Sequence, residues 1–244
     1  MYPRLQKLAG SPDGALFAVG ASVLLLDGAQ LRDTGLPPTF FVEAFWAASR
    51  SSAFASCSSA AGHQILHWDG TSWTVDFTGG GLYGIWGSSA SDIWAVGEGL
   101  RILHRGASGW SEVHPASLGG EWDSWGFGSL FGSGADDLWV IGVRSWWTRA
   151  SGCVGQEGAV QHWDGTRWSP VGIDWNKGNC MYNSDMLWTG ASAGRGKAWL
   201  AGDRGAIAFA SASGATRIST AAGFRGIWGP SPDRIYATQG CPRC

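Results

Sequence analysis

Short runs of apolar residues, interrupted by Gly, Ser, Asp and Pro, follow one another along the whole chain. The clearest segment is LYGIWGSSASDIWAVG at residues 82–97, in which IWG and DIWAVG are runs of strand-forming residues joined by a Ser- and Asp-containing stretch. Runs of this length and composition predict two β-strands connected by a turn. Related segments lie at residues 8–20, 45–57, 130–142, 187–202 and 224–240.

A second type of segment follows several of these strand pairs. It reads ILHWDGTSW at residues 65–73, VQHWDGTRW at 160–168, and ILHRGASGW, an eroded form, at 102–110; residues 23–28, VLLLDG, retain part of it. Asp-Gly between two apolar runs is a strong hairpin signal, and it predicts a two-residue turn with positive φ at both central residues. We expect the closing Trp73 and Trp168 to pack where the returning strand meets the neighbouring sheet.

The two segments together form a repeat with a period of about 40 residues, the period of four-stranded propeller blades. One such blade cannot bury both of its faces, so blades must stack on one another. The sequence therefore predicts an all-β fold, a single β-propeller domain over residues 1–244 with six blade positions of four short antiparallel strands. The last copy, residues 224–240, lacks the second segment, so we expect an incomplete last blade. Five blades plus a remnant are the alternative.

These motifs resemble the Trp-rich propeller repeats of bacterial surface proteins and lipoproteins, notably those of myxobacteria, and the HWDGTxW hairpin resembles a degenerate Asp-box. The resemblance implies a propeller fold and a place outside the cytoplasm: extracellular, on the cell surface or in the periplasm. It implies no catalytic role, because the Asp-box is a structural turn in its own families and a fold does not determine a function.

Charge and hydropathy limit the kinds of partner that this chain is expected to bind. Charged residues make up 15% of the chain and the formal net charge is −2, which argues against a nucleic-acid partner, since such proteins present a basic surface. No apolar run reaches the length of about 20 residues that a membrane span requires. The apolar residues 15–26 match a strand of the repeat, and we expect them to form strands rather than a signal peptide.

The repeat is interrupted around its fourth copy. Residues 144–158 are inserted, residues 172–186 form a long connection, and residues 119–128 precede the copy. We expect all three segments to be loops on one face of the propeller, and aromatic and polar side chains there suit the stacking and hydrogen bonding of a sugar. The alternative is that these Trp residues hold the loops onto the propeller. The candidate ligand-binding residues are Trp122, Asp123, Trp125, Trp146, Trp147, Asp174, Trp175 and Asn176.

The cysteines suggest disulfides rather than a metal site. Cys153 lies in the insert 144–158 and Cys180 in the connection 172–186, and a bond between them would join these two segments in an oxidising compartment. Cys241 and Cys244 form a lone CxxC, a candidate disulfide or two free thiols, since structural zinc needs a second pair or added His. Cys57 replaces a strand glycine of the repeat and is expected to be a buried small residue.

The histidines and the remaining motifs give no catalytic constellation. His67, His104 and His162 hold equivalent positions in three copies, so we expect them to be structural, with hydrogen bonds to a strand or turn. A glycosidase built on the carboxylates Asp123 and Asp174 with Glu121 is a remote alternative. The sequence therefore predicts a non-enzymatic interaction or scaffold module, monomeric and without cofactor or metal, with an unknown protein or a glycan as its partner; a glycan-binding lectin is the alternative.

Overall fold

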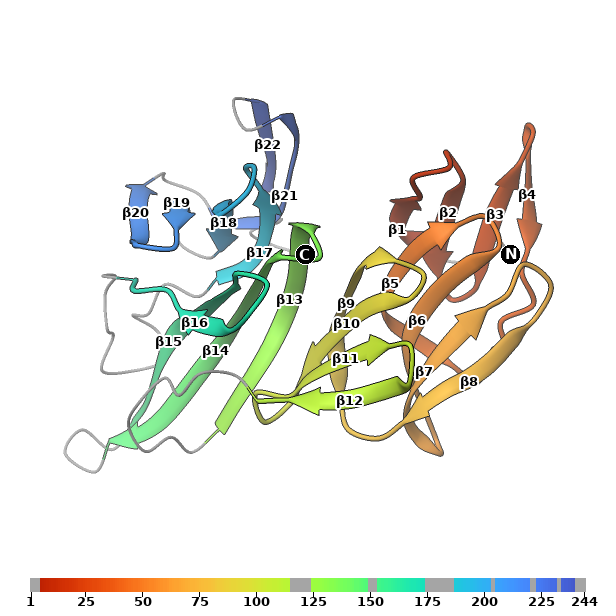
Figure 1. The fold of residues 1–244 in the computed structure, drawn as a ribbon, viewed down its shortest axis with the longest axis horizontal. Coiled ribbons are helices and arrows are strands. Elements are labelled where there is room, and N and C mark those ends of the chain that lie inside the picture. The colour runs from red at the N-terminus through yellow and green to blue at the C-terminus, as the bar shows by residue number, and fades with distance from the viewer. Residues whose placement is uncertain are drawn as a thin grey trace. The chain divides into compact units, whose positions relative to one another are not determined.

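The computed structural model describes residues 5–114, 124–148, 153–173, 187–202, 205–219, 223–231 and 234–239. Antiparallel β-strands dominate these ranges (Figure 1). No helix that could cross a membrane occurs in them.

The strands form successive sheets, here named A to F in chain order. Sheet A contains β1 (Leu5–Gly10), β2 (Leu16–Gly20), β3 (Val23–Asp27) and β4 (Gln30–Asp33). Sheet B contains β5 (Phe41–Ser49), β6 (Ser52–Ser59), β7 (Gly62–Trp68) and β8 (Trp73–Thr78). Sheet C contains β9 (Leu82–Ser89), β10 (Asp92–Gly97), β11 (Ile102–Gly106) and β12 (Gly109–Val113).

The remaining sheets come from the second half of the chain. Sheet D contains β13 (Ser124–Gly134), β14 (Asp137–Thr148), β15 (Cys153–Trp163) and β16 (Trp168–Pro170). Sheet E contains β17 (Leu187–Ser192), β18 (Lys197–Gly202), β19 (Ala206–Ser211) and β20 (Gly214–Ser219). Sheet F contains β21 (Phe224–Ser231) and β22 (Arg234–Gln239).

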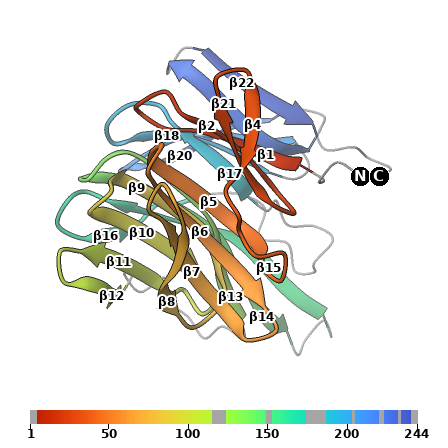
Figure 2. The same ribbon diagram turned by 90° about the vertical axis from the view of Figure 1, so that its right-hand side faces the viewer.

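Within each sheet, every strand pairs with the next along the chain, as Figure 2 shows for β5 to β8. The chain divides into two compact units, residues 1–97 with 103–112 and residues 98–102 with 113–244, so sheets A to C belong to the first unit and D to F to the second. Within each unit the first strands of successive sheets are neighbours: β1 contacts β5, β5 contacts β9, β13 contacts β17, and β17 contacts β21. The predicted plan of strand pairs followed by hairpins is thereby confirmed for the described residues.

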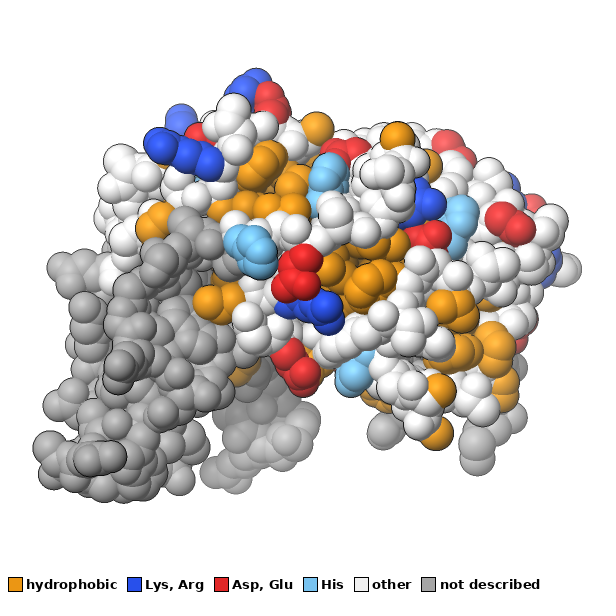
Figure 3. All heavy atoms as spheres, turned by 60° about the horizontal axis from the view of Figure 1, so that its bottom comes forward, with side chains coloured by type: hydrophobic (Ala, Val, Ile, Leu, Met, Phe, Trp, Pro, Cys, Tyr) orange, Lys and Arg blue, Asp and Glu red, His pale blue; other side chains and the backbone are white. Residues whose placement is uncertain are grey.

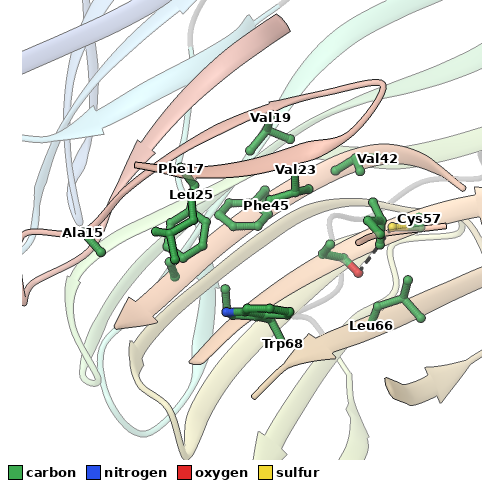
Figure 4. Close-up of a cluster of buried hydrophobic side chains, with 14 residues drawn as sticks. Ala15, Phe17, Val19, Val23, Leu25, Val42, Phe45, Cys57, Leu66 and Trp68 are labelled. Atoms are coloured by element: carbon green, nitrogen blue, oxygen red, sulfur yellow. Dashed lines mark hydrogen bonds between the residues drawn. The ribbon is translucent and has the colours of Figure 1, made fainter. Parts of the chain in front are cut away.

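The core of the first unit lies between successive sheets. Phe17 of β2 and Phe45 of β5 join sheets A and B, with ring centroids 5.2 Å apart (Figure 4). Trp68 of β7 belongs to the same cluster and is fully buried. Burial of each such side chain contributes roughly 1.5–3 kcal/mol. A second cluster, which includes Phe54 and Ile93, joins sheets B and C in the same way.

The second unit repeats this arrangement. Trp139 of β14 and Leu200 of β18 belong to one cluster between sheets D and E, and Ile207 and Ile227 to another between sheets E and F. Within each unit, successive sheets thus pack on one another, as expected of a repeat whose faces cannot be buried alone.

One expectation about the interruptions is wrong. Most of residues 144–158 do not form a loop, because β14 and β15 continue in register from Leu138↔Trp163 out to Thr148↔Cys153. Residues 124–128, also expected to belong to a loop, lie in β13 alongside them, with Ser124 opposite Ser145. The inserted residues lengthen a three-stranded ladder, and this extension of sheet D, formed by residues 124–127, 143–148 and 153–158, is visible in Figure 1.

Candidate functional site

Polar residues of the repeat form one recurring arrangement at the start of the second strand of a sheet. In sheet C, His104 Nε2 lies 2.7 Å from Asp92 Oδ1, and Ser88 Oγ donates to the other carboxylate oxygen of Asp92. Trp94 donates its Nε1–H to Asp92 Oδ1 at 3.2 Å, and its ring stacks on the His104 ring at a centroid separation of 4.0 Å. The four side chains therefore tie three strands of the sheet together.

Sheet D contains the same arrangement in a more buried form. His162 Nε2 lies 2.7 Å from Asp137 Oδ1, and the side chain of Asp137 is 1% exposed. Ser133 donates to the carboxylate, and Trp139 packs on the His162 ring with centroids 4.4 Å apart. The backbone N–H of Gly196, in the turn between β17 and β18 of sheet E, also donates to Asp137 Oδ1, at 3.0 Å, so this carboxylate connects sheet D to sheet E.

Sheet B has a reduced version, in which Ser52 replaces the aspartate. Ser52 Oγ lies 3.2 Å from His67 Nε2, and the His67 ring stacks on Phe54 at a centroid separation of 4.4 Å. Burial lowers the pKa of His67. The predicted structural role of the three equivalent histidines is confirmed.

The aspartate-containing form of this arrangement does not suit nucleophilic catalysis. In sheets C and D the serine hydroxyl donates to the carboxylate, whereas a serine nucleophile needs its hydroxyl on the imidazole, with the carboxylate on the far side of the ring. The imidazole is therefore not placed to remove the proton of Ser88 or Ser133.

The Asp-Gly hairpins are built around a carboxylate rather than around a two-residue turn. Trp68 pairs with Trp73, which leaves four residues in the loop. Asp69 Oδ1 accepts from the backbone N–H groups of Thr71 and Ser72, both at 2.8 Å, and from the Thr71 hydroxyl. Gly70 has a φ of +98°, but Leu100 is the one residue other than glycine with positive φ among the described residues. The predicted turn with positive φ at both Asp and Gly is therefore wrong.

The second copy has the same geometry. Asp164 Oδ1 accepts from the backbone N–H of Thr166 at 2.9 Å, from its hydroxyl at 2.6 Å and from the backbone N–H of Arg167 at 3.0 Å. Hydrogen bonds to the ionised form favour it, so those from Thr166 and then Arg167 lower the pKa of Asp164 to about 2. The pKa of Asp69 is also lowered, by the bonds from Ser72 and Thr71. Both carboxylates thus hold their own loops.

The third strand of three sheets also donates to the turn between the first two strands. Trp68 Nε1 donates to the carbonyl of Arg50 at 3.1 Å, and Trp163 Nε1 donates to the carbonyl of Ala135 at 3.1 Å. In sheet C the equivalent position is Arg105, whose guanidinium donates to the carbonyl of Ala90 at 3.4 Å. The same backbone oxygen is thus used in each sheet, although the donor side chain differs.

Sequence reasoning missed the contacts of this Arg105. Its Nε lies 2.8 Å from Asp76 Oδ2 in β8, and Trp110 Nε1 donates to the same oxygen at 2.7 Å. The ion pair joins sheets B and C at a half-buried position, where the side chains are 24% and 19% exposed. The sequence did carry a signal, because HRGA in this copy replaces the HWDG of the others. An arginine in place of the tryptophan could have been expected to make a different polar contact.

Of the two closing tryptophans, Trp73 lies as predicted, against the neighbouring sheet. Trp73 donates its Nε1–H to the hydroxyl of Thr34 in the connection after sheet A, at 3.0 Å. Trp168 is buried, with its ring against Trp163 at a centroid separation of 5.7 Å.

The extension of sheet D brings three of the candidate binding residues together through the backbone. Trp125 in β13 is paired with Arg144 in β14, and Trp146 and Trp147 follow two and three positions further along β14. The side chains of these three tryptophans lie outside what the structure describes, as do Trp122, Asp123, Asp174, Trp175 and Asn176 entirely.

The structure describes the side chain of Cys57 but not those of the other cysteines. Cys57 is fully buried in the core between sheets A and B, as predicted, and burial raises the pKa of its thiol to about 12 with a further contribution from Glu43. Cys153 begins β15, but its side chain and residues Cys180, Cys241 and Cys244 lie outside the described residues. The predicted disulfides therefore stay predictions.

The described surface has a mixed character. On the face shown in Figure 3, hydrophobic side chains form small groups interspersed with Asp, Glu, Arg, Lys and His. Within the described ranges, no three His, Cys, Asp or Glu side chains cluster as metal ligands would.

Comparison with known proteins defines the fold class. The solved structure of YCF48 bound to a D1 peptide is similar with a TM-score of 0.64 and 15% identity, over 96% of this chain and 74% of that one. The extracellular domain of BT4673 from B. thetaiotaomicron gives a TM-score of 0.62 at 12% identity, over 97% of this chain and 33% of that one. The WD40 β-propeller domain of Doa1 gives 0.52 at 15% identity, over 81% of this chain and 61% of that one.

The fold is therefore of the β-propeller type. No protein-family model and no curated protein matches the chain.

Proposed function

We propose that this chain is a non-enzymatic interaction module of a bacterial surface or secreted protein, built as a β-propeller with six blade positions, the last of them incomplete. The observation that carries the proposal is the use made of the repeat's polar residues. Asp92, Asp137, Asp69 and Asp164 all accept several hydrogen bonds from within their own sheets or loops. Residues of catalytic type in the described repeats thus hold the scaffold together.

The structure of the repeat directs attention to the extension of sheet D as the interaction surface. It is the part of the described sheets where strands run well beyond the repeat, for example along β14 from Asp137 to Thr148. Binding residues commonly lie on segments that a rigid scaffold positions, and here the scaffold is the buried core around Trp139. We propose that a partner protein binds there.

A glycan is the second candidate partner. The observation in its favour is the backbone register that places Trp125, Trp146 and Trp147 on adjacent strands of this extension. Indole rings are the side chains best suited to stack on the C–H faces of sugars. A lectin would use them with the candidate polar residues Asp123, Asp174 and Asn176.

A glycan array with the purified chain tests the two candidates. The double variant Trp146→Ala, Trp147→Ala is compared with Trp228→Ala, which removes an exposed tryptophan from sheet F. Binding that is lost in the double variant and kept in the control would establish the lectin. An array without binding, together with a cooperative melt of the same protein, supports a protein partner, to be sought by cross-linking against the double variant.

The same preparations test the absence of catalysis. Each is incubated with soluble polysaccharides, and the release of reducing ends is measured. Release that the variant Asp123→Asn or Asp174→Asn abolishes would contradict a non-enzymatic role. Small-angle scattering tests the six-bladed ring, since an elongated particle would contradict it.

A further inference from the structure

The first strand of each sheet contains a β-bulge at the same position. In sheet B, Val42 is opposite Cys57 and Ala44 is opposite Ser56, so Glu43 between them is the extra residue. A bulge re-aims a side chain of its strand, and bulges are frequent beside binding sites. The extra residues of sheets A to F, in order, are Gln6, Glu43, Tyr83, Gly128, Trp188 and Arg225.

The bulged residue varies from sheet to sheet, whereas the residue before it keeps one character. The residues directly before the bulge are Leu5, Val42, Leu82, Phe127, Leu187 and Phe224. All six are large and apolar, and four of them are buried. The bulged residues range instead from glycine to a carboxylate, a phenol, an indole and a guanidinium. The repeat thus fixes an apolar anchor and varies the residue beside it, as expected of a scaffold that presents recognition residues.

Two of the bulges lie in one cluster of the first unit. Glu43 belongs to β5 and Tyr83 to β9, and these two strands lie side by side (Figure 1). Ser58 Oγ donates to Glu43 Oε1 at 2.9 Å, and Ser58 is paired directly with His63 across β6 and β7. The Tyr83 ring meets the His63 ring edge to face, with centroids 6.5 Å apart. The two bulges are therefore connected through Ser58 and His63.

The cluster lies on a buried apolar base. Ile65, two positions after His63 on the same strand, packs with Leu82, the anchor residue before Tyr83, in the core between sheets B and C. Ser56 Oγ donates to the Leu82 carbonyl at 2.6 Å and holds the two sheets together at this level. The bulged side chains are thus presented from a fixed backbone.

Two polar groups of the cluster have no counterpart in the described part of the chain. Glu43 is exposed and forms no ion pair with a described residue, so its charge is uncompensated there. His63 Nδ1 is buried and has no hydrogen-bond partner among the described residues, which is an unfavourable state for a polar atom. Phe41, paired with Ser58 from the other side, adds an aromatic ring that is 56% exposed.

We propose that this cluster binds a guanidinium group, such as an arginine side chain, with the bulged Glu43 as its specificity-determining residue. A guanidinium is planar, carries five N–H donors and binds a carboxylate through two of them. A further N–H would satisfy His63 Nδ1 in its Nε2–H tautomer. Aromatic rings such as those of Phe41 and Tyr83 favour a cation above their faces.

This site is independent of the interaction surface proposed on sheet D. Its residues belong to sheets B and C of the first unit, whereas the extension of sheet D belongs to the second. The double variant Trp146→Ala, Trp147→Ala should therefore keep the binding of a guanidinium, and either proposal can fail alone.

The experiment titrates the isotopically labelled full chain with Nα-acetyl-arginine methylamide and follows the backbone amides by NMR. Nα-acetyl-citrulline methylamide is the matched probe, because its side chain has a similar shape and planarity but no charge. We expect saturable shifts of the Ser58, His63 and Tyr83 amides with the arginine probe. The citrulline probe should bind at least about tenfold more weakly, equivalent to about 1.4 kcal/mol.

Matched variants test the role of the bulged carboxylate. Glu43→Gln should weaken binding of the arginine probe by about tenfold, because the charge-assisted pair is lost. Asp33→Asn makes the same change of charge at an exposed position of β4 and should leave the affinity unchanged. Glu43→Lys should abolish binding of the arginine probe and favour Nα-acetyl-glutamate methylamide instead. A cooperative melt of each variant confirms that it is folded.

Three results would overturn the proposal. The first is equal binding, or no binding, of the arginine and citrulline probes. The second is unchanged affinity in Glu43→Gln, which would leave the bulge only the structural role of preventing strand addition at the inner edge of the sheet. The third is loss of arginine binding in the Trp146→Ala, Trp147→Ala variant, which would assign the site to sheet D.

Discussion

Substitution of Gly70 by alanine probes how the Asp-Gly loop docks on its sheet. Gly70 has a φ of +98°, and a Cβ at this position would lie 2.9 Å from Ser51 Cβ and 3.2 Å from Ser51 Cα, in the turn between β5 and β6. Gly62, with a φ of +101°, would place its Cβ in open space. The two glycines therefore have similar φ angles but different surroundings.

The expected losses of stability follow from the backbone strain that the two positions share and from the surroundings in which they differ. Left-handed backbone in an L-residue costs about 1–2 kcal/mol, and both variants bear this cost. Overpacking a filled position costs about 1–3 kcal/mol more, and only Gly70→Ala bears it, because the clash involves the backbone of Ser51. We expect the free energy of unfolding to fall by about 1–2 kcal/mol in Gly62→Ala and by about 2–5 kcal/mol in Gly70→Ala.

Urea unfolding of both variants, followed by circular dichroism, measures the difference. Gly165→Ala provides an independent repetition in sheet D, where the added Cβ would lie 2.8 Å from Asp136 Cβ at a φ of +95°. Equal losses in Gly70→Ala and Gly62→Ala would refute the contact with the β5–β6 turn and leave backbone strain as the sole cause.

Three further predictions concern the carboxylates and the buried thiol. Because the folded pKa of Asp164 is depressed to about 2 from 3.8, its contribution to stability is present above pH 3.8 and is lost as the pH falls towards 2; urea titrations at several pH values should show a shallower loss in Asp164→Asn, and identical slopes would contradict this. Asp137→Ala leaves the buried or half-buried donors of His162, Ser133 and Gly196 without their acceptor and should cost about 3 kcal/mol, against about 1–2 kcal/mol for Asp92→Ala at the more exposed equivalent, as measured by chemical denaturation; the reverse order would refute the role of burial. Cys57, with its thiol pKa raised to about 12, should resist iodoacetamide at pH 8 until urea unfolds the chain; rapid labelling of the native protein, seen by mass spectrometry, would contradict its burial.

The strands could be predicted because each strand pattern recurs several times along the chain. DIWAVG alone is a weak signal, but its copies at equivalent positions mark the second strand of a sheet, and β10 and β14 lie where two of these copies place them. The histidines were assigned correctly for the same reason, since equivalence in three copies indicates a shared structural environment.

The errors arose where a rule about a short sequence motif was applied without regard to the residues around that motif. The Asp-Gly pair predicted a two-residue turn, but the Asp69 carboxylate collects the N–H groups of Thr71 and Ser72, which stabilises a wider loop. The inserted residues 144–158 were taken as a loop because they lie outside the repeat. Their Trp and Val residues favour strands, however, and the flanking β14 and β15 supply the ladder that they extend.

The backbone oxygens of Arg50, Ala90 and Ala135 have a consequence for how such a repeat diverges. Each accepts a bond from the third strand, given by tryptophan in two sheets and by arginine in the other. A main-chain acceptor persists through any substitution, and a donor can be replaced by any side chain of sufficient reach that bears an N–H. A blade can therefore lose its recognisable sequence motif while keeping the same hydrogen bonds. Counting motifs in the sequence then underestimates the number of blades.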